Sequence, residues 1–260
     1  MIADDIGEAG CGRIVKCQEG VPNRMKTFNF ITEEQDFRTS EAYKTLRTNL
    51  TFCGDDVQVI AVTSCLPNDG KSSVSKNIAV TLAEAGKRVL FIDADLRKSV
   101  MLGRIDFNGV MVGLSHLLSG QAELAEAICQ SNYKNLNAIF AGSYPPNPAE
   151  LLGNTRFKNL ITMMRKNFDY IIIDTPPLGS VIDSAIVAAE CDGTVMVIRS
   201  GRVSYKFANR VKEQLQKTGC RILGVVLNGV NMKENSGYYS KYYSSYYNGY
   251  YASQSEGKGR

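Results

Sequence analysis

The sequence predicts one α/β domain of the P-loop NTPase type, with a mostly parallel sheet covered by helices on both faces. Three observations predict it: short apolar segments alternate with helical patterns, turn residues separate them, and a Gly-Lys-Ser sequence opens the helix after one apolar segment. The chain has 260 residues, of which 44% are apolar and 22% charged, as in globular proteins. A fold of this length buries roughly three-quarters of its unfolded surface, so we expect a large core.

The first predicted helix covers the segment EAYKTLRTNLTF, with Ser40 as its N-cap. Its apolar face consists of Ala42, Leu46 and Leu50. A strand from Val57 to Thr63 and a turn rich in Pro, Asn, Asp and Gly come next. The following helix, Lys71 to Ala85, ends before Gly86 and has an apolar stripe of Val74, Ile78 and Leu82.

The same alternation continues through the rest of the domain. Further strands are predicted at Arg88 to Ile92, Leu136 to Ala141, Tyr170 to Asp174, Thr194 to Arg199 and Ile222 to Leu227. Helical patterns between them cover Asn154 to Lys166, Val181 to Ala189 and Ser204 to Lys217. Strands that are apolar throughout are typical of a sheet buried on both faces, which is why we expect it to be parallel.

Composition divides the chain into three parts. Residues 1–38 are expected to form an N-terminal arm, because the first thirty or so are rich in Gly, Asp, Glu and Asn and lack periodicity. Residues 39–234 form the predicted P-loop domain. Residues 235–260 contain eight of the thirteen tyrosines within a segment rich in Gly and Ser. Such a composition cannot build a core, so we expect a disordered tail.

Several classes of protein are disfavoured by composition. No window approaches eighteen consecutive apolar residues and the acidic start lacks a signal sequence, so we expect a cytoplasmic chain. Seven scattered cysteines without a C-x-x-C pair indicate neither a disulfide framework nor a zinc site. A formal charge of +4 is too small to argue for nucleic acid as a partner.

The strongest chemical signal is the run VIAVTSCLPNDGKSS, in which a strand leads into a helix. Backbone N–H groups and the helix dipole at such a turn favour phosphates; Lys71 would reach the β and γ oxygens of ATP, and Ser72 would ligate Mg²⁺. The strict motif would begin at Cys65, and a loop one residue longer begins at Ser64, so this is a variant. The expected nucleotide-binding residues are Ser64, Pro67, Asn68, Asp69, Gly70, Lys71, Ser72 and Ser73.

Two more predicted strands end in aspartates. VLFIDADLR places Asp93 and Asp95 two residues apart, and YIIIDTPP ends at Asp174. The carboxyl ends of parallel strands share one edge of a sheet, so these groups can converge on Lys71. A single Asp at a strand end is more often a turn or cap residue, but three of them beside a P-loop make coincidence less probable.

On these motifs the chain resembles the bacterial tyrosine kinases (BY-kinases), especially separate cytoplasmic kinase chains of capsular or extracellular polysaccharide systems. The resemblance covers roughly residues 40–231 and the tail. It is carried by EAYKTLRTNLTF, TSCLPNDGKSS, VLFIDADLRKS, AGSYPPNPAELL, YIIIDTPPLGSVIDS and the tyrosine cluster. It implies that Lys71 and Ser72 belong to Walker A, Asp93 and Asp95 to Walker A′, and Asp174 to Walker B.

The resemblance implies an ATP-dependent and Mg²⁺-dependent kinase whose catalytic residues are Lys71, Asp93 and Asp95. We assign the Mg²⁺ shell to Ser72, Asp93 and Asp174, and proton acceptance from tyrosine to Asp95. Asn228 follows the last strand, where related ATPases often contact adenine, although a plain turn fits equally well. The expected phosphate acceptors, in tails of neighbouring subunits, are Tyr238, Tyr239, Tyr242, Tyr243, Tyr246, Tyr247, Tyr250 and Tyr251.

The resemblance also implies partners. The family pattern E-x-x-R-x-x-R mediates ring-like self-assembly and here reads Glu41, Lys44 and Arg47, with Lys at the middle position, where it cannot form the two-pronged contact of Arg. Without the family this stretch is an ordinary charged helix face. A transmembrane activator of the polysaccharide co-polymerase type would recruit the chain to the inner face of the membrane, and a tyrosine phosphatase would oppose it.

Two other functional classes compete with the kinase. A partitioning-type P-loop ATPase would switch a binding surface without phosphorylating protein, but it usually carries an early P-loop lysine, and no Lys lies between Asn49 and Gly70. An iron–sulfur carrier needs a cysteine pair, and its C-terminal part has only Cys191 and Cys220, far apart. By itself the tail could be a low-complexity, sticky segment. Beside a P-loop domain, its tyrosines favour the kinase.

Overall fold

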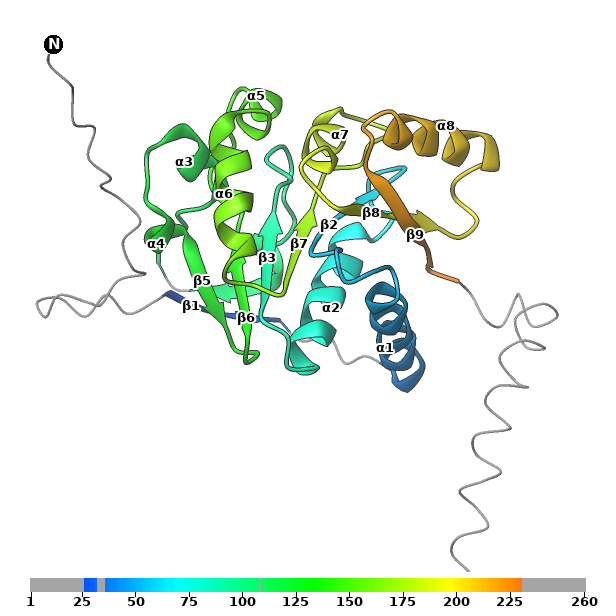
Figure 1. The fold of residues 1–260 in the computed structure, drawn as a ribbon, viewed down its shortest axis with the longest axis horizontal. Helices are drawn as coiled ribbons and strands as arrows, with labels where there is room; N and C mark the ends of the chain where they lie inside the picture. The colour runs from blue at the N-terminus through cyan, green and yellow to red at the C-terminus, as the bar shows by residue number, and fades with distance from the viewer. Residues whose placement is uncertain (1–25, 32–35, 108, 231–260) are drawn as a thin grey trace, which may run out of the picture.

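The computed structural model describes residues 26–31, 36–107 and 109–230 (Figure 1). In chain order the strands are β1 (Lys26–Phe30), β2 (Val59–Ser64), β3 (Val89–Asp93), β4 (Ile105–Phe107), β5 (Ile128–Ser131), β6 (Leu136–Ile139), β7 (Tyr170–Asp174), β8 (Gly193–Arg199) and β9 (Arg221–Asn228). The helices are α1 (Phe37–Thr51), α2 (Lys71–Glu84), α3 (Leu114–Ser119), α4 (Leu124–Ala127), α5 (Pro148–Leu152), α6 (Thr155–Arg165), α7 (Asp183–Ala188) and α8 (Tyr205–Gln216).

These described strands form one sheet in the order β4-β1-β5-β6-β3-β7-β2-β8-β9. The run from β6 to β9 is parallel throughout, while β5 pairs antiparallel with β6 and β4 antiparallel with β1. The prediction of a mostly parallel sheet is therefore confirmed. The predicted strand from Tyr170 to Asp174 has its observed bounds, and the others are placed within two residues of theirs.

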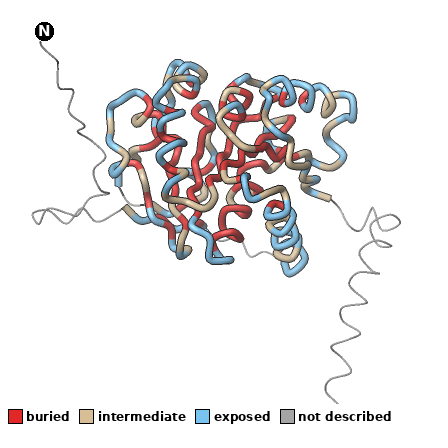
Figure 2. Tube along the Cα trace, viewed as in Figure 1, coloured by how far each residue is buried: buried red, intermediate tan, exposed pale blue. Residues whose placement is uncertain are grey.

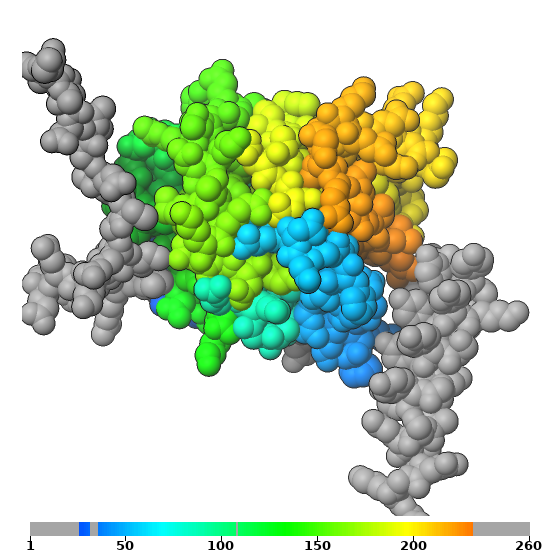
Figure 3. Space-filling model, viewed as in Figure 1, coloured from blue at the N-terminus to red at the C-terminus, as the bar shows by residue number. Residues whose placement is uncertain are grey.

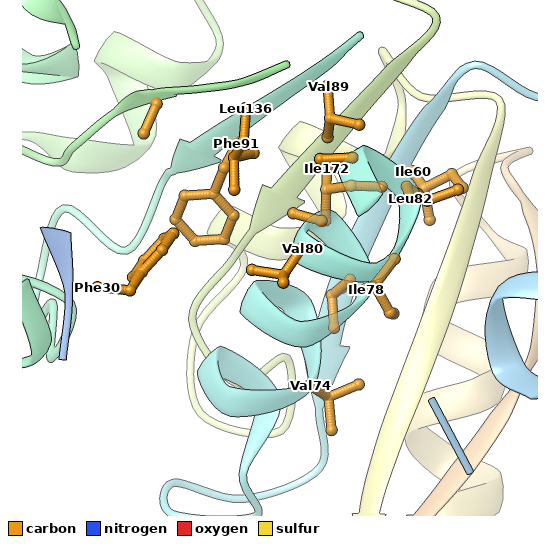
Figure 4. Close-up of a cluster of buried hydrophobic side chains, with 14 of the residues drawn as sticks. Phe30, Ile60, Val74, Ile78, Val80, Leu82, Val89, Phe91, Leu136 and Ile172 are labelled. Atoms are coloured by element: carbon orange, nitrogen blue, oxygen red, sulfur yellow. The ribbon is translucent and has the colours of Figure 1, made fainter. Parts of the chain in front are cut away.

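Helices cover both faces of the sheet. On one face α2 packs its stripe of Val74, Ile78 and Leu82 against the sheet, and each of the three is at most 1% exposed (Figure 4). On the other face α6 and α7 cover β3, β7 and β2, and α8 packs beside them over β8 and β9. The central strands β2, β3 and β7 lie between the two layers and are buried nearly throughout (Figure 2). Burial on both faces explains their continuous apolar sequences.

The expected arm over residues 1–38 is wrong at residues 26–30, which form β1 inside the sheet. Phe28 and Phe30 are buried there, and the Phe28 ring meets the Phe140 ring edge to face, with centroids 4.9 Å apart. Sequence reasoning missed this strand because only alternate residues of KTFNF are buried, so no continuous apolar run marks it. The short strands β4 and β5 were missed for the same reason.

The start of α1 also differs from the prediction. The helix begins at Phe37, and Asp36 is its N-cap, because the Asp36 carboxylate accepts a hydrogen bond from the Thr39 N–H at 2.7 Å. Ala42 is exposed, whereas Leu46 and Leu50 face the core as expected. Residues 37 and 38 of the expected arm therefore belong to α1. Residues 1–25 and 32–35, and the tail over residues 235–260, lie outside the described residues. None of the described helices is long and apolar enough to cross a membrane.

Candidate nucleotide-binding and catalytic site

The predicted site residues of the P-loop and of the two aspartate-ended strands meet at the carboxyl edge of the parallel strands. β2 runs into the loop that leads to α2, and β3 and β7 lie side by side with Asp93 directly opposite Asp174. β8 and β9 continue the sheet on the other side of β2. The strand order therefore brings together groups that lie up to about a hundred residues apart in the sequence, from Lys71 to Asp174, as the sequence predicted.

The P-loop turns sharply between β2 and α2. Asn68 and Gly70 both have left-handed backbone conformations, with φ of 64° and 93°. At Gly70 a Cβ atom would lie 2.0 Å from the Asn228 Nδ2 atom, so a side chain there would displace the Asn228 amide. Glycine at this position therefore suits both the left-handed turn and the contact with Asn228. A backbone without a side chain at this point is what lets a loop wrap around phosphate groups.

Neighbouring side chains hold this loop in shape. The Asn228 side-chain amide donates to the Asp69 carbonyl at 2.9 Å, and the Asp69 carboxylate accepts from the Leu66 N–H at 2.9 Å. Arg199 at the end of β8 donates to the Asn68 carbonyl at 3.3 Å. The structure therefore places Asn228 against the P-loop as a brace. No local pattern predicts this contact, because Asn228 and Asp69 are separated by 159 residues.

Lys71 begins α2 and points into a group of carboxylates. Its Nζ atom lies 3.1 Å from Asp95 Oδ2, 3.7 Å from Asp174 Oδ2 and 3.1 Å from the Ser72 hydroxyl. Burial lowers the pKa of Lys71, but the attraction of Asp174 and Asp95 outweighs burial, so the pKa is raised overall. Lys71 is therefore a fixed positive charge at the place where phosphates would bind.

Asp93 and Asp174 are both almost completely buried. Burial, with repulsion from Asp174, raises the pKa of Asp93 to about 7, although the Ser99 hydroxyl donates a hydrogen bond to it. Burial also raises the pKa of Asp174, against the attraction of Lys71. Neither Asp174 oxygen has a hydrogen-bond partner within the described residues. Buried carboxylates with unused oxygens are unfavourable unless a cation or another donor reaches them.

This cluster fits a magnesium nucleotide. Three carboxylates, from Asp93, Asp95 and Asp174, face the single ammonium group of Lys71, which leaves two formal negative charges for a cation to offset. Among the described residues no three acidic, His or Cys groups could hold a metal without other ligands. Mg²⁺ suits such a site, because it keeps several waters and binds through one or two carboxylates together with substrate phosphates. The Ser72 hydroxyl, beside Lys71, could supply a further oxygen ligand.

Some of the predicted residues lie away from the centre of the site. Ser73 and Pro67 are at its margin, and Glu41, Lys44 and Arg47 are on α1. Ser73 accepts a hydrogen bond from Arg104 at 2.6 Å, and Pro67 is exposed on the P-loop. On α1, Lys44 pairs with Glu41 in the same helix at 2.7 Å, and Arg47 donates to the Thr81 carbonyl of α2 at 3.1 Å. The eight tail tyrosines lie outside the described residues.

Sequence reasoning missed several side chains that support the site. Ser99 and Arg97, close behind the Asp93–Asp95 pair, contact Asp93 and Asp183 respectively. For Ser99 and Arg97 the only signal in the sequence was that they are polar residues shortly after the aspartates of a catalytic motif. Arg199 and Arg104 had no signal, since their partners lie in the distant P-loop and its helix.

The fold and the site together define a nucleotide-binding P-loop protein. A family model described as an AAA domain matches residues 57–222. The solved structure of the septum site-determining protein MinD from Pyrococcus horikoshii, complexed with Mg-ADP, is similar with a TM-score of 0.56 at 25% identity, over 66% of this chain and 70% of that one.

Similarity to bacterial kinases is greater. The tyrosine-protein kinase CpsD of Streptococcus agalactiae is 43% identical over 194 residues, which cover 75% of this chain and 85% of that protein. YwqD of Bacillus subtilis, also a tyrosine-protein kinase, is 37% identical over 84% of this chain and 93% of its own length. The kinase domain of Escherichia coli tyrosine kinase ETK superposes with a TM-score of 0.69 at 33% identity, covering 74% of this chain and 75% of that one. The chain belongs to the family of bacterial tyrosine-protein kinases, and it is an enzyme of that class, which confirms the resemblance inferred from its motifs.

Proposed function

We propose that this kinase transfers the γ-phosphate of ATP to tyrosines in the C-terminal segment of another copy, and so regulates capsular or extracellular polysaccharide synthesis. The observation that carries the proposal is the convergence of Lys71 with Asp95 and Asp174 at the mouth of α2. The eight tyrosines between Tyr238 and Tyr251 are the proposed phosphate acceptors. The support for this role is that eight of the thirteen tyrosines lie in this short segment.

The roles proposed for the site residues follow from their surroundings. Lys71 and the P-loop amides bind and orient the phosphates, while Ser72, Asp93 and Asp174 hold Mg²⁺, which would offset the charge that develops on the transferred group. Asn228 and Asp69 keep the loop in shape for this purpose. The ion pair with Lys71 holds the Asp95 carboxylate beside the place where the phosphates would bind.

Asp95 is the proposed acceptor of the tyrosine proton. A phenol has a pKa near 10, so a carboxylate within reach assists its attack on phosphorus. The variant Asp95→Asn is therefore expected to bind ADP normally but to lose turnover by about 10²-fold or more. Calorimetry and steady-state phosphorylation measure the two effects separately. A kcat like that of the wild type at neutral pH would contradict the assignment.

The proposed partners rest on the family. They are a second copy of the chain, a transmembrane activator of the polysaccharide co-polymerase type at the inner face of the membrane, and an opposing tyrosine phosphatase. Contact between copies would involve the α1 surface of Glu41 and Lys44, whose side chains are 33% and 50% exposed. Arg47 is already bound to α2, so it would act by positioning α1 or would have to exchange partners.

One experiment tests the proposed function directly. Full-length chain carrying Lys71→Met serves as a substrate that cannot phosphorylate itself, and an active chain truncated after Lys233 serves as an enzyme without tyrosines of its own tail. Mixed with labelled ATP and Mg²⁺, the two should give phosphotyrosine only on the full-length substrate. A substrate in which the eight tyrosines are replaced by Phe should stay unlabelled. Label on serine, or equal label on the Phe substrate, would refute the proposal.

A further inference from the structure

Arg97 and Asp183 form a two-pronged ion pair at the border of the site. Arg97 Nε donates to Asp183 Oδ2 at 2.8 Å, and Arg97 Nη2 donates to Asp183 Oδ1 at 3.0 Å. The Asp183 side chain is completely buried, whereas that of Arg97 is 42% exposed. Nothing in the proposed chemistry uses either residue. A buried carboxylate held by one guanidinium is costly to separate, so the pair is a rigid connection.

The first segment that this pair connects is the turn after β3. Arg97 lies two residues beyond Asp95, within a turn held by hydrogen bonds of the catalytic carboxylates themselves. The Asp95 carboxylate accepts from the Lys98 N–H at 3.0 Å, and the Asp93 carboxylate accepts from the Asp95 N–H at 3.2 Å. A shift of Arg97 would therefore be transmitted to Asp95.

The second segment is the loop between β7 and α7, which begins next to Asp174. Hydrogen bonds attach it to β2: the Thr63 hydroxyl donates to the Pro176 carbonyl at 2.9 Å, and the Leu178 N–H donates to the Ser64 carbonyl at 3.0 Å. Asp183 at the start of α7 ends this loop. The position of this loop is therefore fixed by hydrogen bonds to β2 at one end and by the ion pair with Arg97 at the other.

We propose that Arg97 and Asp183 are a positioning pair that fixes Asp95 relative to Asp174 around Lys71. Lys71 contacts one carboxylate from each connected segment, at 3.1 and 3.7 Å, so a small displacement of either segment alters both contacts. Catalytic groups must be held to within about half an ångström to be effective. The inference rests on the proposed function, because it assumes that these carboxylates bind Mg²⁺ and act in phosphate transfer.

The molecule contains a matched control for this pair. Arg88 and Asp169 connect the same two strands at their opposite ends: Arg88 precedes β3, Asp169 precedes β7, and Nε and Nη2 of Arg88 both donate to the Asp169 carboxylate, at 3.2 and 2.7 Å. Both pairs join an arginine to an aspartate through two guanidinium N–H groups, but the Asp183 side chain is fully buried and that of Asp169 is 36% exposed. The control therefore removes the same two charges from the far end of the same strands, and thermal unfolding accounts for the difference in burial.

The test compares double variants of the full-length chain. Arg97→Met alone would leave a buried charge unpaired and could fail to fold, so Arg97→Met with Asp183→Asn removes both charges together. Arg88→Met with Asp169→Asn is the control, and Arg97→Lys keeps the charge without the two-pronged geometry. Calorimetry measures ADP binding while Mg²⁺ is varied, steady-state assays give kcat and KM for phosphorylation of the Lys71→Met substrate, and thermal unfolding monitors stability.

For the Arg97 and Asp183 double variant we expect at least a tenfold rise in the Mg²⁺ needed for half-maximal ADP binding and at least a tenfold fall in kcat. The Arg88 and Asp169 variant should change each by less than twofold, and Arg97→Lys should be intermediate. Equal Mg²⁺ dependence and kcat in the two double variants would overturn the inference. The binding measurement needs no kinase activity: if wild-type protein gave no phosphotyrosine while the Mg²⁺ shift occurred, the proposed function would fail and the positioning pair would stand.

Discussion

The two ends of the same parallel strands carry their charges in opposite ways. At the amino edge Arg88 pairs with Asp169, and the pair is largely solvent-exposed. Hydrogen bonds from Arg88 lower the pKa of Asp169. At the carboxyl edge Asp93 and Asp174 are buried, share one lysine with Asp95, and burial raises the pKa of both.

Two more pairs extend the pattern of the amino edge. The Asp192 carboxylate before β8 is held by Arg165 at 2.7 Å, and Arg165 and two backbone N–H groups lower its pKa against the opposing effect of burial. Arg221 connects β9 to the loop between α1 and β2, donating to Asp56 at 3.0 Å and to the Cys53 carbonyl at 2.7 Å. Figure 3 shows these two segments side by side, in orange and light blue. The ion pairs at the amino edge stabilise the fold, whereas the carboxyl edge combines one such pair, Arg97 with Asp183, with buried carboxylates around Lys71 that are left for a ligand to satisfy.

Removing the lysine should have the largest effect. Lys71→Met leaves three carboxylates without their cation, and it deletes the charge that faces the phosphates. We expect ATP binding and tyrosine phosphorylation to fall by about 10²-fold to 10³-fold or more. Calorimetry and phosphotyrosine analysis measure this. Lys87→Met, an exposed position before β3, is the control and should leave both unchanged. Normal autophosphorylation in Lys71→Met would contradict the proposal that the carboxyl edge, unlike the amino edge, binds the nucleotide.

A pH titration sharpens the same contrast. The pKa of Asp93 is raised from 3.8 to about 7 in the folded chain, so between these values the native state holds a proton that the unfolded state has lost. The contribution of Asp93 to the free energy of unfolding of the Mg²⁺-free protein is therefore complete below about pH 4. It is lost as the pH rises through 7. The decline amounts to at most about 4 kcal/mol.

Thermal unfolding at several pH values measures this decline. Mg²⁺ with ADP should reverse it, because the cation replaces the proton. Asp93→Asn should reduce it to the share of Asp174, whose pKa is also raised, since the amide does not titrate. If the melting temperature of the Mg²⁺-free wild type instead rises steadily from pH 5 to pH 8, ionising the buried carboxyl groups at the carboxyl edge does not destabilise the fold.

At the amino edge we expect a loss of stability without a loss of function. Asp192→Ala removes the acceptor of the Arg165 guanidinium and of the Gln58 and Val59 N–H groups. Because partly buried donors lose their partner, unfolding by guanidinium chloride should show a cost of about 1 to 3 kcal/mol. ADP affinity should stay within twofold of wild type. A larger change in affinity would mean that this edge also serves the site.

The smallest effect is expected at the most exposed pair. Asp56 is 73% exposed and Arg221 is 53% exposed, so their attraction is screened by water. Arg221→Ala should cost about 0.2 to 1 kcal/mol, with much of the difference lost in high salt. Denaturant titrations at low and high salt measure it. A cost that is large and independent of salt would show that the contact with the Cys53 carbonyl, and not the ion pair, holds β9 to the loop after α1.

Elements and chemistry that depend on near neighbours in the chain could be predicted from the amino-acid sequence. The stripe of Val74, Ile78 and Leu82 is a consequence of helical periodicity, and the position of Lys71 at the start of that helix follows from the turn that precedes it. The apolar runs that end at Asp93 and Asp174 predicted two buried parallel strands, and the rule that such strands end at one edge predicted that the two carboxylates meet.

The distant residues that support that site could be identified only from the folded chain. Nothing local indicates that Asn228 lies against Gly70, that Arg97 pairs with Asp183, or that residues 26–30 enter the sheet between β4 and β5. These contacts depend on strand order and on the loops that cross the sheet edge, which periodicity does not encode. The raised pKa of Asp93 has the same origin, because it results from burial by surrounding elements and from repulsion by a carboxylate 81 positions away in the sequence.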